Sequence, residues 1–165
     1  MSKQMRDAIN ALSGREVEEI LRRIKHPVAR IALFIMYFCG LSLSEVLQLR
    51  FDDIDFKAKI LRVRFKRSDA CPSERSIPIP DWLLHQIRSI NIKSNYLFPD
   101  ESGARHISIP TLQKALRVAS IESGFKKQVS ITALHHVRML QLLEQGYNLE
   151  NIHKFLGHNG AEQTF

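Results

Sequence analysis

Hydrophobic positions recur at helical spacing in the first third of the chain. A helix is predicted to start at Ser13, because Glu16 follows three residues later as in a capping box. Its apolar face comprises Val17, Ile20, Leu21 and Ile24. A second helix is predicted over Val28 to Tyr37, which is apolar on nearly every side and should lie in the core. A third is predicted over Ser44 to Leu49, with Ser42 or Ser44 as its cap.

The pattern changes period in the middle of the chain. Apolar and basic residues alternate from Ile60 to Phe65, which is typical of a half-exposed strand. A polar turn, Lys66 to Glu74, leads to a second predicted strand, Arg75 to Ile79. Because proline cannot donate a ladder hydrogen bond, Pro78 indicates either an edge position for this strand or a place in the ladder that needs no N–H. Together these segments predict a small antiparallel hairpin.

Helical spacing returns after the hairpin. Helices are predicted over Trp82 to Ile90, Ile109 to Ser123, Ile131 to Gln145, and a closing segment whose apolar positions are Leu149, Ile152, Phe155 and Leu156. The turn residues of Asn95 to Gly103 predict a loop. The fold class is therefore mainly α with a small antiparallel β-sheet inserted after the third helix. Residues 1–12 are interpreted as an extension, and residues 13–165 as one domain.

Composition narrows the choice of function. A 165-residue chain that is 44% hydrophobic is long enough for one buried core. Its net charge of +7 is typical of proteins that bind polyanions such as nucleic acid. Cys39 and Cys71 form neither a disulfide framework nor a metal-ligand spacing, and Cys39 is predicted to be a buried thiol. The longest apolar run, Ile31 to Cys39, is too short for a membrane span, so no membrane association and a cytoplasmic, nucleoid-associated setting are expected.

Four segments in order carry a resemblance to one family. They are Phe38 to Asp55 (FCGLSLSEVLQLRFDDID), the hairpin ending in Arg75 to Ile79 (RSIPI), Tyr96 to Pro99 (YLFP), and Leu142 to His158 (LLEQGYNLENIHKFLGH). From about Leu12 onward the chain resembles the catalytic domain of tyrosine recombinases, the phage integrases and their chromosome-resolving relatives. The resemblance implies the catalytic-domain fold of that family.

The resemblance also implies a chemistry. In the family a tyrosine attacks a DNA phosphate, and two arginines hold the phosphate oxygens through forked donors. A hairpin lysine acts as general acid, and two histidine-type positions orient the reacting groups. No metal or cofactor is required. Double-stranded DNA is the implied partner.

The family residues can be carried over one by one. The place of the first arginine holds Ser42, whereas Glu45 matches the family's acidic position. Glu45 is interpreted either as support for the site or as a helix-surface carboxylate. Lys66 corresponds to the hairpin lysine, and it also suits an ordinary solvated turn. His158 matches the closing histidine, with a simple helix-capping role as the alternative.

The second arginine belongs to an HxxR motif, for which two registers are open. An ungapped match places Thr132 at the histidine and His135 at the arginine. A literal HxxR exists at His135 to Arg138, but it requires deleting nearly one helical turn. We prefer the ungapped register, under which Lys66, His135 and His158 are the catalytic remnants and Arg138 is a surface or DNA-contacting residue.

The family's tyrosine would follow His158 by nine residues, at position 167, and the sequence stops at Phe165. We therefore expect a C-terminally truncated domain of a mobile-element integrase homologue that binds DNA and is deficient in strand cleavage. An active recombinase is a further expected partner. Two alternatives stay open: a genuine recombinase whose tyrosine comes from downstream or from another subunit, and a protein-interaction module without a DNA role.

DNA contacts are expected mainly from the hairpin. Five basic residues fall within fourteen positions, and their cluster suits phosphate contacts. The expected DNA-binding residues are Arg62, Arg64, Lys66, Arg67, Arg75 and Arg138.

Overall fold

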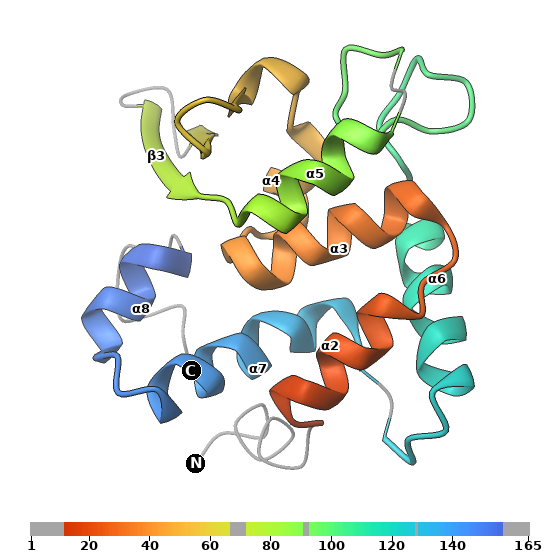
Figure 1. Ribbon diagram of the computed structural model, residues 1–165, viewed down its shortest axis with the longest axis vertical. Coiled ribbons are helices and arrows are strands. Elements are labelled where there is room, and N and C mark those ends of the chain that lie inside the picture. The colour runs from red at the N-terminus through yellow and green to blue at the C-terminus, as the bar shows by residue number, and fades with distance from the viewer. Residues whose placement is uncertain (1–11, 67–71, 91–92, 128, 157–165) are drawn as a thin grey trace.

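The computed structural model describes residues 12–66, 72–90, 93–127 and 129–156. Helix α3 (Pro27–Cys39) crosses the middle of the molecule and contacts α2 (Gly14–Arg22), α5 (Asp81–Ser89), α6 (Ile109–Glu122) and α7 (Ile131–Glu144) (Figure 1). Nine of its thirteen residues are buried, as expected from a sequence that is apolar on nearly every side. This helix is therefore the centre of the core.

A capping box stabilises the start of α2, as its sequence suggests. The Ser13 hydroxyl accepts a hydrogen bond from the Glu16 amide at 3.3 Å, and the Glu16 carboxylate accepts one from the Ser13 amide at 2.6 Å. The two bonds satisfy amides that a helix start leaves unpaired. The expected capping box is confirmed.

The next two helices are joined by a sharp turn. α3 is followed directly by Gly40, whose φ of 69° lies in the left-handed region that glycine adopts at little cost. α4 (Leu43–Gln48) starts immediately afterwards with Ser42 as its cap. The choice between Ser42 and Ser44 as the cap is thereby settled. The turn brings the start of α4 close to the end of α3, where the candidate site lies.

A three-stranded antiparallel sheet follows the short 3₁₀ turn Phe51–Asp53. It comprises β1 (Ile54–Asp55), β2 (Ile60–Lys66) and β3 (Pro72–Pro78), in the order β1-β2-β3. β3 is an edge strand, which confirms the expectation drawn from Pro78. In the ladder Val63 pairs with Arg75, and Arg64 pairs with Glu74. Since side chains alternate between the two faces of a strand, this register decides which arginines face the helices.

The closing helix is held by a separate, smaller core. α8 (Leu149–Leu156) packs on α7, where Met139, Leu142 and Ile152 form an apolar cluster apart from the main one. Every predicted helix and strand is present in the described residues, with bounds that differ from those predicted by no more than three residues, except that α2 ends at Arg22 and not near His26. Cys39 is a buried free thiol, as predicted. Within the described residues, no helix is both long and apolar enough to cross a membrane.

Candidate functional site

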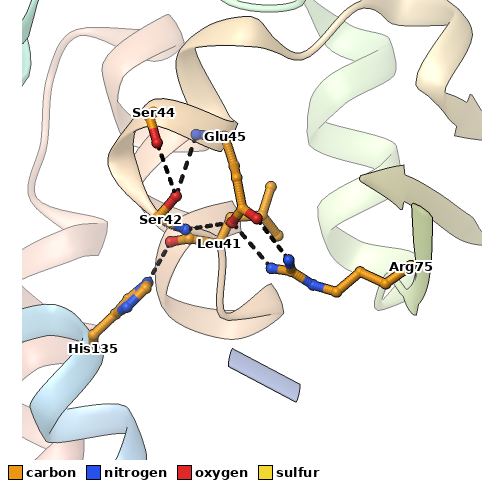
Figure 2. A network of polar contacts seen from close by, with 6 residues as sticks. All are labelled: Leu41, Ser42, Ser44, Glu45, Arg75 and His135. Atoms are coloured by element: carbon orange, nitrogen blue, oxygen red, sulfur yellow. Dashed lines mark hydrogen bonds and ion pairs between the residues drawn. The ribbon is translucent and has the colours of Figure 1, made fainter. Parts of the chain in front are cut away.

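The start of α4 is stabilised by a second capping box. The Ser42 hydroxyl accepts from the Glu45 amide at 3.3 Å, and Glu45 Oε2 accepts from the Ser42 amide at 2.8 Å (Figure 2). A hydroxyl contact to Ser44 Oγ at 3.2 Å completes the turn. The Ser42 side chain is therefore engaged in local structure at the position where the resemblance implies an arginine.

Arg75 and Glu45 form a largely buried ion pair that joins the sheet to α4. Arg75 donates from both terminal nitrogens to the two carboxylate oxygens of Glu45, at 2.6 and 3.0 Å (Figure 2). The side chains are 21% and 6% exposed, respectively. This forked arrangement is the strongest geometry available to such a pair. Glu45 is thus a buried structural group, and the alternative of a helix-surface carboxylate is wrong.

His135 approaches the same corner from α7. Its Nε2 contacts the carbonyl oxygen of Leu41, and because a carbonyl can only accept, Nε2 carries the proton. Burial lowers the pKa of His135, and this effect outweighs the opposing effects of the Leu41 carbonyl and Glu45. The imidazole is therefore neutral near neutral pH. His135 and Arg75 reach the corner from opposite sides (Figure 2).

The basic residues of the hairpin do not share one face. Arg62 and Arg64 are exposed on the solvent face of β2, with weak partners in Asp55 at 3.4 Å and Glu74 at 3.8 Å. Arg75 pairs in register with the buried Val63, and its guanidinium is bound by Glu45. The expectation that Arg75 belongs to an exposed phosphate-binding cluster is corrected accordingly. The sheet register separates it from the other arginines.

Arg138 also differs from the expectation of a surface residue. It is half-buried, with its guanidinium 5.6 Å from the ring centroid of Tyr37 and 5.8 Å from that of Phe38. It donates to Gln141 at 2.6 Å, and its buried Nε finds no acceptor in the part of the chain that the structure describes. Arg138 is therefore partly buried against α3, one helical turn beyond His135.

The other expected site residues are described only in part. Lys66 is the last residue of β2, where its backbone pairs with Pro72, but its side chain lies outside the described part of the structure. Arg67 and His158 lie outside the described residues altogether. Thr132 is exposed on the first turn of α7, two residues after the helix cap Ser130. Among the described residues no cluster of three or more His, Cys, Asp or Glu side chains could hold a metal ion.

Residues 10–164 match the sequence profile described as the phage integrase family. The chain belongs to this family. It is 28% identical over 159 residues to a tyrosine recombinase of Thermosipho africanus, with 96% of this chain and 53% of the relative covered. It is also 28% identical over 170 residues to the tyrosine recombinase XerA of Thermococcus kodakarensis, covering 98% and 58%. The chain thus spans about half the length of the curated relatives it matches.

Solved structures show the same fold. A crystal structure of XerA recombinase superposes with a TM-score of 0.77 at 20% identity, covering 93% of this chain and 57% of that one. A lambda integrase dimer bound to a COC' core site gives a TM-score of 0.69 at 14% identity, covering 93% and 59%. The integrase catalytic-domain fold, mainly helical with a small antiparallel sheet, is therefore confirmed.

The α3–α4 corner contains side-chain contacts that were not expected from the sequence. Of the two HxxR registers, the structure places His135 at the α3–α4 corner and Arg138 one turn away from it. Sequence reasoning missed the pairing of Arg75 with Glu45 and the contact of His135 with the Leu41 carbonyl. The alternation along β3 carried a signal for the first, since Arg75 alternates with Ser76 and shares its parity with the apolar Ile77.

Proposed function

We propose that this chain is a double-stranded DNA-binding tyrosine recombinase homologue with a weakened capacity for strand cleavage. Family membership supports DNA as the partner. Structures of similar proteins bound to DNA support it as well, among them the XerH site-specific recombinase bound to its difH substrate. The net charge of +7 favours a polyanionic partner independently. A role beside an active recombinase at shared sites, within a mobile element, belongs to the same proposal.

The α3–α4 corner carries the argument for weak cleavage. In the family two arginines hold the scissile phosphate, and here Ser42 and His135 take their places under the ungapped match. Ser42 is used as a helix cap, and His135 is neutral and directed at a backbone carbonyl. The nearby guanidinium of Arg75 is already neutralised by Glu45. The described part of the corner therefore offers no unpaired guanidinium to a phosphate.

The expected kinetic effect is large. Loss of one preorganised donor to a developing oxyanion costs roughly 2.7–4 kcal/mol of transition-state stabilisation. Losing two such donors slows the reaction by roughly 10⁴–10⁶-fold if the two effects are additive. The effects of residues within one site are often not additive. DNA binding suffers less, because phosphate contacts outside the corner supply most of the affinity.

A salt series with duplex DNA tests the binding half of the proposal. The exposed Arg62 and Arg64 should supply phosphate contacts, so the R62Q/R64Q variant should lower the log–log salt slope by roughly 0.9 per lost contact. The matched control is R22Q/R23Q, which removes two exposed arginines that are likewise paired, at the C-terminal end of α2. An absence of binding even at low salt, or an equal effect of the control, would favour the protein-interaction module.

Nicked suicide substrates test the cleavage half. No denaturation-resistant protein–DNA adduct is expected. Changing Ser42 and His135 to arginine should instead tighten DNA binding by about tenfold or more, since a hydrogen bond to a charged group is worth roughly 1.5–3 kcal/mol. An adduct formed by the unmodified chain would support the second candidate, a genuine recombinase, and would overturn the proposed deficiency.

A further inference from the structure

A cavity of about 490 Å³ lies between α7, α8, the last turn of α3 and the link from β3 to α5. In Figure 1 this region is found where α8 lies between β3 and α7. Its walls are mostly apolar, and the wall residues that matter here are Phe38, Pro80, Leu142 and Ile152. Such a volume is within the range typical of small-molecule sites, which combine apolar walls with a few polar groups.

One of those polar groups is the guanidinium of Arg138. It rests over the rings of Tyr37 and Phe38 and donates to Gln141, while its buried Nε has no acceptor among the described residues. No carboxylate of the described residues forms an ion pair with it. A partly buried charge is costly unless an opposite charge or further hydrogen bonds compensate it. An anionic ligand would supply the opposite charge that Arg138 lacks among the described residues.

The cavity supplies further polar atoms around the cation. Asn151 and Tyr147, from α8 and the turn before it, line the cavity together with Arg138. An amide and a phenol can both hydrogen-bond to a carboxylate oxygen. The arrangement is therefore one cation and two neutral polar groups set in an apolar wall.

We propose that this cavity is a binding site for a small apolar monocarboxylate, such as an aromatic or branched aliphatic acid. The carboxylate pairs with Arg138, and the hydrocarbon part fills the space between Phe38, Leu142 and Ile152. A polyanion such as nucleic acid fits less well, because the walls are apolar and Arg138 is the one cation among the described lining residues. The proposal does not depend on the DNA-binding function.

Occupation of the cavity should stabilise the position of α8. In the described residues α8 is held mainly by the small cluster in which its Ile152 packs on Met139 and Leu142 of α7. A ligand in the cavity would also contact Pro80 and thereby connect α8 to the β3–α5 link. A ligand that binds the folded state stabilises it by mass action, so the slowing of hydrogen exchange should be greatest in α8.

Phenylacetate is the probe, and phenylacetamide is its neutral isostere. Calorimetry and chemical-shift titration of the whole chain should show roughly millimolar or tighter binding of phenylacetate. The amide should bind about tenfold or more weakly, because it loses the charge-assisted hydrogen bonds to Arg138. R138Q should abolish this preference, whereas R117Q, a matched change at an exposed arginine of α6, should preserve it.

A second variant keeps the test independent of the folding of R138Q. N151W places a bulky side chain at the cavity from an exposed position of α8 and should eliminate binding while leaving the fold intact. The proposal is overturned if phenylacetate produces no shift, if the amide binds equally well, or if N151W binds as the unmodified chain does.

Discussion

Because Glu45 is more deeply buried than Arg75, removing Arg75 should destabilise the fold more than removing the charge of Glu45. R75Q leaves the 6%-exposed carboxylate of Glu45 with the Ser42 amide as its hydrogen-bond donor. Removing one member of a buried pair costs about 3–5 kcal/mol, because the remaining charge is uncompensated. E45Q should cost less. Its amide oxygen can still accept from Ser42, and Arg75, at 21% exposed, retains access to water.

The magnitudes convert into observable shifts in the melting temperature. For a domain of this size 1 kcal/mol corresponds to about 2–4 °C, so R75Q should lower the midpoint by roughly 6–20 °C. R62Q is the matched control, because the partner of Arg62 is 3.4 Å away and the two side chains are 47% and 33% exposed. Exposed pairs contribute about 0–1 kcal/mol, so this control should change the midpoint little.

Urea unfolding of both single variants and of E45Q/R75Q completes a double-mutant cycle. We expect the double variant to be more stable than R75Q alone, because no buried carboxylate remains. The reasoning is refuted if R75Q costs no more than R62Q, or if the two single effects simply add. Either result would mean that the forked contact contributes no more than an exposed ion pair.

Two further predictions concern titratable groups. Burial lowers the pKa of His135, so as the pH falls below the ordinary histidine value of about 6.5 the unfolded state binds a proton first and the folded state loses stability. Urea unfolding between about pH 5 and pH 8 should show a smaller loss of stability for H135Q than for the unmodified chain, and parallel curves would contradict this. Burial raises the pKa of Cys39 to about 12, so in a C71S background a thiol reagent should label Cys39 only as fast as the protein opens, whereas rapid labelling of the native state would contradict its burial.

The helices and strands were predictable because the sequence patterns that specify them involve residues close together in the chain. The capping box at Ser13 and Glu16 and the alternation of Ile60 to Phe65 each depend on neighbouring residues, and the structure confirms both. Contacts across the fold were not predictable in this way. The partner of Arg75 depends on the register between two strands and on where α4 packs against the sheet. The burial of Arg138 likewise depends on how α7 meets α3.

Ser42 links the chemistry of the corner to its stability. As the cap of α4 it accepts from the Glu45 amide, and the Glu45 carboxylate accepts in return while also binding Arg75. Replacing a serine cap by a residue that cannot cap typically costs roughly 0.5–2 kcal/mol. An arginine at position 42 would therefore add a phosphate donor and remove a cap in the same step, and it would compete with Arg75 for Glu45. A gain in DNA affinity by S42R should thus be accompanied by a loss of thermal stability. S42A, which removes the cap and adds no charge, should reproduce the loss without the gain.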